Sequence, residues 1–460
     1  MVEINGYGIA VIAFLAASLV IGSLTYKLVQ KSGRRLIVAG KSLPLFMVGT
    51  MLVAQSVDGN STLGAIALIY QFGFWGGAVI PIGLGICLLL TGTFYGKKLN
   101  KMSMFTLPDY YFRRYGNASE GMSGVLMIIS FVVLVAGNFA ASGFILETAI
   151  GIPFLWGIII AALVVLTYTI AGGLFASAYT DIFQIYLAIG SFWAAFIFFA
   201  GGFSGVPFDV ILASAPPAYL DLSGLFDVAN GALINWAGIL ALGLGDIVAL
   251  DFMERVFAAR DPKTVRRGAF MGAGLTFFTN GGLLAISSVI SRNILQRIIR
   301  RRWLGKEAWS DNKLLWITRM AVVPVMISAL VLGYMIPQPG VYLILAFDIV
   351  FAGALAPLTL GLFWRKANMP AAVTSLIVGS ALRLLMFFVI PPELAGLDTM
   401  IPPPISFALF IVVALATQKR WPGKERHDVN DYVPPEEDII AGEDLKHFKS
   451  ASSGATNSAI

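Results

Sequence analysis

The chain has 460 residues, of which 57% are hydrophobic and 13% are charged, and its mean hydropathy is +0.81. Soluble globular chains carry about 25% charged residues, so this composition excludes an ordinary soluble domain and indicates a membrane protein. The net charge of +6 does not indicate a nucleic-acid partner, because the basic residues are spread over the loops between apolar segments.

Cysteine and histidine are too few to build a catalytic or metal centre. The single cysteine, Cys87, excludes an intrachain disulfide, and both histidines, His427 and His447, follow the last apolar segment. The sequence also lacks a pair of carboxylates suited to catalysis, and we therefore predict that the protein is not an enzyme.

Apolar segments recur along the chain with the length that a helix needs to cross a hydrocarbon core of about 30 Å. The first has no basic residue before it and no A-x-A cleavage pattern, so we interpret it as a true span and not as a signal peptide. The sequence predicts an all-α polytopic membrane protein with about twelve spans. They are expected at about 6–28, 45–70, 76–96, 122–148, 153–171, 180–202, 230–253, 268–291, 314–336, 340–364, 371–391 and 402–418.

The loops between these segments alternate in basic content, which predicts the orientation. Segments 27–41, 97–114 and 255–267 are rich in lysine and arginine, whereas 71–75 and 203–229 contain neither. We expect a protein of the cell inner membrane with its N-terminus outside and its C-terminus in the cytoplasm. Residues 1–418 would form the membrane domain, and the polar tail 419–460 is expected to be disordered.

The alternation fails once. A strongly basic segment, 292–313, follows the basic segment 255–267 after a single apolar run, and one span cannot have both ends on the same side. Either 268–291 is a re-entrant segment, or the chain lacks material that would make two spans.

A carboxylate at membrane depth is costly and indicates a functional site. Asp58 lies within Ala54–Gly64, where six of eleven residues are polar and two are glycine. This composition predicts an unwound helix, whose free carbonyl groups suit a cation and whose free amide groups suit a solute. The alternative is that these polar residues join neighbouring helices.

A second break is predicted at Gly243–Asp251, where two glycines precede Asp246. The two breaks are five spans apart, as an inverted five-helix repeat requires. Asp246 is the stronger functional candidate, because it has no basic partner in its span. Asp251 and Arg255 are spaced i, i+4 and can pair, either as a gate or as a purely structural contact.

Three further charged residues, Asp181, Asp348 and Arg383, have more than one possible role. Thr180 and Asp181 either cap the sixth span or guide a cation towards the cytoplasm. Asp348 and Arg383 are lone charges in late spans, and the sequence shows no partner for either.

Several motifs give the chain a close resemblance to the sodium:solute symporter family, which contains proline, pantothenate and sugar symporters. The most specific is Gly172-Gly173-Leu174 followed by Thr180-Asp181 and Gln184. The others are Ala39–Pro44, in which the family usually has arginine at the Lys41 position, and Thr106–Tyr110, Ser287–Arg292 and Trp364–Asn368.

The resemblance implies a leucine-transporter-type inverted-repeat fold that holds its solute midway between broken helices and opens to each side in turn. It also implies a sodium site made by the carbonyl groups of Ala54 and Val57 and by two hydroxyl groups of a later helix. Those hydroxyl positions fall here on Phe277 and Phe278, with Thr279 the nearest hydroxyl and Thr276 the next. Asp58 departs from the family as well, since relatives often have serine there.

The family also implies thirteen spans, one more than this chain shows. The missing hydroxyl groups and the failed loop alternation indicate the same change, an internal deletion near residues 275–279.

The resemblance therefore leads us to expect a secondary active transporter that imports a small polar organic solute with sodium, in the lipid bilayer and without an obligate protein partner. The expected sodium ligands are Ala54, Val57 and Thr279, with Asp181 on the exit path. Contacts to the solute or a cation are expected from Asp58, Asn60, Ser61 and Asp246. The alternatives are a proton-coupled carrier that uses Asp58 or Asp246, and a transporter-like sensor, against which the short tail argues.

Overall fold

The computed structural model describes residues 6–200, 221–276 and 311–423, and this part of the chain is built from helices without β-strands. Eight of its helices are long and apolar enough to cross a membrane. A bent pair, Ala232–Val248 and Leu250–Ala258, adds a ninth crossing if the two pieces form one span. The prediction of an all-α polytopic membrane protein is confirmed.

The helices before residue 201 include the first of the broken spans. They are α1 (Gly6–Leu24), α2 (Tyr26–Val29), α3 (Gly33–Val38), α4 (Leu45–Ala54), α5 (Gly59–Phe72), α6 (Phe74–Leu90), α7 (Gly96–Lys101), α8 (Leu107–Tyr115), α9 (Asn117–Ile150), α10 (Phe154–Gly172) and α11 (Leu174–Ala200).

The later helices are interrupted in places by short segments of altered helical pitch, labelled η. They are α13 (Ala232–Leu240), η6 (Ala241–Gly245), η7 (Asp246–Val248), α14 (Leu250–Ala258), α15 (Pro262–Leu275), α17 (Asp311–Met335), α18 (Pro339–Phe363), α19 (Met369–Thr374), η10 (Ser375–Gly379), α20 (Ser380–Val389), α21 (Leu397–Met400) and α22 (Pro402–Thr417).

These helices coincide with the expected spans except in one region. The segment expected at 268–291 is described only as far as Thr276, where α15 has ended. Thr279, the expected deletion and most of the tail 419–460 therefore lie outside the described residues, and those expectations stay predictions.

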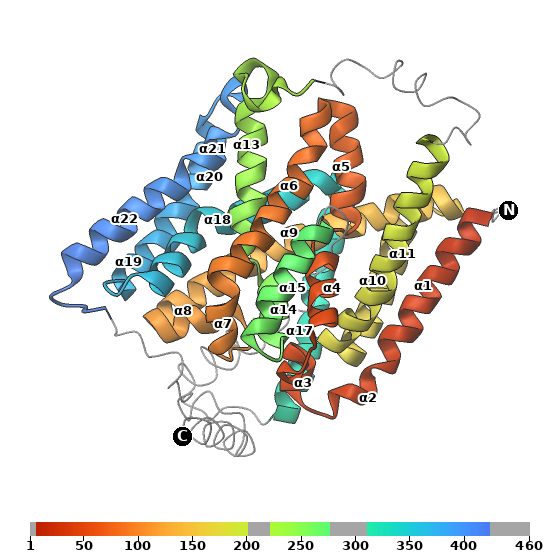
Figure 1. The fold of residues 1–460 in the computed structure, drawn as a ribbon, viewed down its shortest axis with the longest axis horizontal. Helices are drawn as coiled ribbons and strands as arrows, with labels where there is room; N and C mark the ends of the chain where they lie inside the picture. The colour runs from red at the N-terminus through yellow and green to blue at the C-terminus, as the bar shows by residue number, and fades with distance from the viewer. Residues whose placement is uncertain (1–5, 201–220, 277–310, 424–460) are drawn as a thin grey trace.

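The bundle has two flanks and a centre (Figure 1). Helices α1, α10 and α11 lie on one flank and α19 to α22 on the other, with α4, α5, α6, α14 and α15 between them. The basic helices α2 and α3 lie at one end, and the start of α13 and α21 lie at the opposite end. We call the end that carries α2 and α3 the basic end.

The long helix α9 packs against α10, α17 and α18 and forms much of the core. Helix α18 continues past Pro357, whose missing amide hydrogen leaves the carbonyl of Gly353 without its helical partner. The Ser375 hydroxyl donates to that carbonyl across 3.2 Å. Tyr111 and Tyr115 of α8 donate to the carbonyls of Ala354 and Pro357 and so join α8 to the same part of α18.

Helix α5 crosses the start of α18 in backbone contact, because glycine stands on both sides of the crossing. A methyl group added at Gly64 would lie 2.4 Å from the Cα atom of Gly340. Neither backbone can move away locally, so this crossing requires the absence of a side chain at Gly64.

Gly64→Ala is expected to lower the free energy of unfolding by about 1–3 kcal/mol, because overpacking forces the two helices apart. Gly85→Ala in α6 is the matched control, since no atom lies within 4 Å of its added methyl group. Thermal unfolding in detergent measures both. The control should unfold at or slightly above the wild-type temperature, and equal midpoints for the two variants would contradict the packing argument.

Candidate functional site

The first predicted break is present. Helix α4 ends at Ala54 and α5 begins at Gly59, with Asp58 as its N-cap. Asp58 Oδ1 accepts a hydrogen bond from the Ser61 amide across 2.8 Å, and Ser61 Oγ accepts one from the Asp58 amide across 2.9 Å. This reciprocal pair begins a new helix within the span.

The break leaves backbone carbonyl groups available. Those of Ala54 and Val57 accept no hydrogen bond from the described part of the chain, whereas the Asp58 carbonyl accepts from the Thr62 amide and hydroxyl. Free carbonyl oxygens at this depth are suitable ligands for a small cation.

The second break also lies where it was expected. Helix α13 passes through η6 and η7, and Ala249 then adopts an extended conformation with φ −75° and ψ 139°. Helix α14 begins at Leu250, and the two pieces are bent by 48°.

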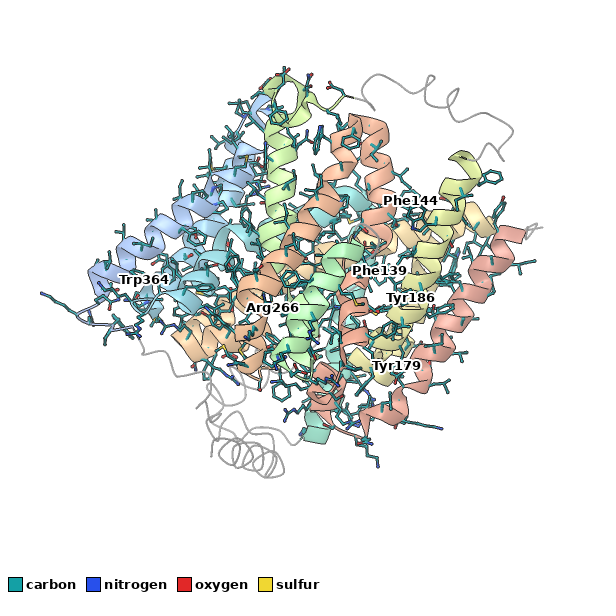
Figure 2. The ribbon with its side chains drawn as sticks, in the orientation of Figure 1. Phe139, Phe144, Tyr179, Tyr186, Arg266 and Trp364 are labelled. Atoms are coloured by element: carbon teal, nitrogen blue, oxygen red, sulfur yellow. The ribbon has the colours of Figure 1, made fainter. Side chains whose placement is uncertain are left out.

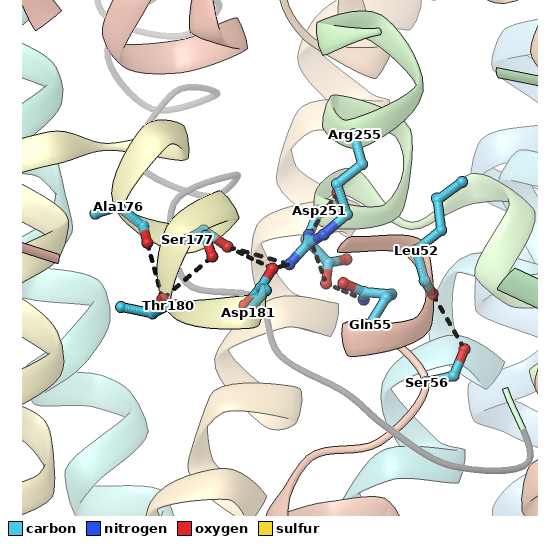
Figure 3. Close-up of polar contacts among 9 residues, drawn as sticks. All are labelled: Leu52, Gln55, Ser56, Ala176, Ser177, Thr180, Asp181, Asp251 and Arg255. Carbon is cyan, nitrogen blue, oxygen red and sulfur yellow. Dashed lines mark hydrogen bonds and ion pairs between the residues drawn. The ribbon is translucent and has the colours of Figure 1, made fainter. Parts of the chain in front are cut away.

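Buried side chains join the two breaks (Figure 3). Gln55 in the first break donates from Nε2 to Asp251 Oδ2 in α14. Arg255 Nη1 donates to the Asp251 carbonyl across 2.9 Å, and its Nη2 lies 3.6 Å from Asp181 Oδ2 in α11. Asp251 and Arg255 are only 1% and 2% exposed. The expected i, i+4 pair is therefore confirmed, and it belongs to a larger network.

The alternative that Thr180 and Asp181 cap a helix is wrong. Helix α11 begins at Leu174, directly after Gly173, whose φ of 56° ends α10. Thr180 and Asp181 therefore lie inside α11, too far from its first turn to bind free backbone amides.

A cavity of about 530 Å³ lies beside the first break. Helix α9 contributes Phe139, near the middle of the bundle (Figure 2), together with Asn138 and Ser142. The cavity continues along α11 to Asp181 and along α14 to Arg255. Its volume is within the range that small-molecule sites occupy.

Four of the expected site residues line this cavity, namely Ala54, Val57, Asp58 and Asp181. Asn60 and Ser61 are not among its lining residues. Asn60 instead donates from Nδ2 to the Leu134 carbonyl across 2.8 Å and so joins α5 to α9, and Ser61 forms the cap with Asp58.

Asp246 also lies away from the cavity lining. It is 1% exposed in η7, and the Cys87 thiol lies beside its carboxylate. Thr279 lies outside the described residues. Thr276, just before it, brings its hydroxyl to 3.4 Å from that of Ser56 in the first break.

Two sets of contacts could not be predicted from the sequence. One is formed around the first break, where Gln55 donates to Asp251 and Asn138 accepts from the Asn60 amide. The other is a network in which Arg383 of α20 pairs with Asp348 of α18 and lies 3.0 Å from Asp398 of α21. Two opposite lone charges in apolar spans were a usable signal for this pairing, because such charges seldom stay unpaired in a membrane.

A backbone clasp joins the broken spans at the basic end. The Leu43 amide donates to the Ala258 carbonyl, and the Arg260 amide donates to the Leu43 carbonyl, each across 3.1 Å. Lys41 donates to the Asn100 carbonyl across 2.8 Å beside this clasp. Burial lowers the pKa of Lys41 to about 8.

The sequence of the chain is similar to those of known membrane transporters. A sequence model of the sodium:solute symporter family matches residues 36–286, more than half of the chain. The chain belongs to the sodium:solute symporter family. A sodium/glucose cotransporter of Vibrio parahaemolyticus is 24% identical over 84% of each chain. The high affinity choline transporter 1 of Homo sapiens is 24% identical over 82% of this chain and 76% of its own.

The fold has a solved counterpart in a Na⁺-coupled sialic acid symporter in a substrate-bound outward-open state. The TM-score is 0.73 at 17% identity, over 92% of this chain and 99% of the other. The expected leucine-transporter-type fold is thus confirmed. The protein itself, as a member of the sodium:solute symporter family, is a multi-pass membrane transporter coupled to sodium, and it is not an enzyme.

The alignment with the Vibrio relative bears on the expected deletion. It has 471 positions, more than the 460 residues of this symporter, although it covers only 84% of the chain. The symporter therefore lacks residues at some of the aligned positions. Gaps of this kind also arise from insertions in the relative, and the deletion near residues 275–279 stays a prediction.

Proposed function

We propose that the protein imports a small polar organic solute together with sodium by alternating access, across the inner membrane of the cell. The solute would occupy the cavity of about 530 Å³ beside Asp58. The observation that carries this proposal is the meeting of both broken spans at one buried network, in which Gln55 binds Asp251. A change of solute or ion at one break can thereby act on the other.

Sodium would bind at the first break, on the carbonyl oxygens of Ala54 and Val57 and on the hydroxyl of Thr279. The two carbonyl groups support this assignment because they have no donor in the described chain and line the cavity. Asp181 would guide the ion towards the basic end, which we assign to the cytoplasm because its loops are rich in lysine and arginine.

Solute-driven uptake of radioactive sodium into proteoliposomes tests this proposal. Small polar solutes are added in turn to the outside at fixed pH, and at least one is expected to increase sodium uptake. Lithium or potassium should not replace sodium in driving the uptake of that solute. Thr279→Ala should lower the affinity for sodium about tenfold, because the loss of one ligand that contributes about 1.4 kcal/mol has this effect. Uptake of the solute at an unchanged rate without sodium would reject the proposal.

A proton-coupled carrier is a second candidate, and Asp246 is the observation in its favour. Asp246 is a carboxylic acid that is 1% exposed within a membrane span, and ionisable groups at that depth are the usual carriers in proton relays. Uptake driven by a pH gradient alone, and abolished by Asp246→Asn, would favour this candidate over sodium coupling.

A further inference from the structure

The charge on the cavity wall is unbalanced around Asp58. Arg255 is the basic residue among the described lining residues, and it contacts Asp181 and Asp251. Asp58 has no basic side chain beside it in the described chain, and the groups that contact its carboxylate are backbone amides, those of Ser61 and Asn60 among them, and the Asn138 carboxamide. The wall therefore presents a carboxylate that is hydrogen-bonded but not paired with a basic side chain of the described chain.

Two hydroxyl groups near Asp58 are left as hydrogen-bond acceptors. The Thr62 hydroxyl already donates to the Asp58 carbonyl across 2.7 Å, and the Ser142 hydroxyl donates to the Asn138 carbonyl across 2.9 Å. Each hydroxyl has one hydrogen, so both present lone pairs to the cavity. Farther along the wall, Asp251 Oδ1 is buried without a hydrogen-bond partner. A solute with N–H or O–H donors would satisfy these acceptors.

We propose that the transported solute carries a protonated primary or secondary amine, and that the Asp58 carboxylate binds this group. An ammonium group with N–H bonds supplies both the positive charge that Asp58 is without and the donors that these acceptors need. A quaternary ammonium supplies the charge without donors, and a neutral alcohol supplies donors without the charge. This inference rests on the proposed function, since it concerns the solute in the same cavity.

Two variants remove the charge of Asp58 and keep the helix start. Asparagine and serine are N-caps as good as aspartate, so Asp58→Asn and Asp58→Ser are expected to fold. Glu147→Gln is the matched control, because it removes one exposed carboxylate from α9, which also carries Asn138.

The experiment measures thermal stabilisation of the purified full-length protein in detergent with sodium present. The probes are primary and secondary amines of up to about fifteen non-hydrogen atoms, each paired with a hydroxyl or quaternary analogue. Ethanolamine, for example, is paired with ethylene glycol and choline, and glucosamine with glucose. We expect at least one amine to stabilise the wild type and Glu147→Gln in preference to its analogues. Its affinity should fall at least about tenfold in both Asp58 variants.

A sodium titration without any amine separates the possible failures. Wild-type protein that sodium does not stabilise would count against the proposed function itself. The amine inference is overturned if sodium binds but no amine does, or if the analogues bind as well as the amines. It is equally overturned if Asp58→Asn keeps the wild-type affinity for the amine. The same holds if this variant loses as much affinity for sodium as for the amine, since Asp58 would then be part of the ion site.

Discussion

Arg255→Met is expected to lower the free energy of unfolding by about 3–5 kcal/mol and to abolish sodium-dependent transport. Removing one member of a buried ion pair leaves the other charge uncompensated, and Arg255 contacts two carboxylates, Asp181 and Asp251. Both carboxylates line the cavity, and Asp251 also binds Gln55 of the first break. Stability is measured by thermal unfolding in detergent, and transport by sodium uptake into proteoliposomes.

Two further variants test whether the burial of this charge explains the effect. Arg260→Met removes an ion pair to Asp261 whose side chains are 59% and 41% exposed, and exposed pairs contribute about 0–1 kcal/mol. Adding Asp251→Asn to Arg255→Met should restore part of the lost stability, because fewer buried carboxylates then lack a partner. If Arg255→Met and Arg260→Met had equal unfolding temperatures, Arg255 would not be the counter-ion of this network.

Arg383→Met is expected to destabilise the protein by a similar amount, about 3–5 kcal/mol, without weakening sodium binding. Asp348, whose side chain is 3% exposed, would keep only the hydrogen bond from the Thr399 hydroxyl. Helices α18, α20 and α21 would lose the ion pairs that join them. Arg383 does not line the cavity beside the first break, so the effect should be confined to stability.

Thermal unfolding and a sodium titration on the surviving folded protein separate these two effects. Lys366→Met is the control, because it removes an exposed positive charge after the end of α18 and should leave the unfolding temperature unchanged. A sodium affinity that falls with Arg383→Met would show that the network reaches the ion site and would refute this division of roles.

The sequence was sufficient to predict both breaks and the spans other than the one expected at 268–291, because each depends on residues close together in the chain. The length of an apolar run determines whether a helix can cross a membrane. A cluster of polar residues and glycines within such a run, as at Ala54–Gly64, predicts where the helix ends. These signals need no knowledge of which helices are neighbours.

Contacts between spans could not be predicted in the same way. The bond from Gln55 to Asp251 and the pair of Arg383 with Asp348 join residues far apart in the chain, and hydropathy does not show which helices pack together. Which residues of α5 face the cavity could be predicted in part. Asp58 and Thr62 are four residues apart and both line the cavity, so helical spacing places Asn60 and Ser61 on other faces once Asp58 is located.

The clasp at the basic end is made by main-chain atoms, through the amide and carbonyl of Leu43, the Ala258 carbonyl and the Arg260 amide. Side-chain substitutions at these positions leave both bonds in place, with proline as the exception because it has no amide hydrogen. The join between the two broken spans thus tolerates mutation. In homologous sequences it need not leave a pattern of preferred residues, even where the contact itself is kept.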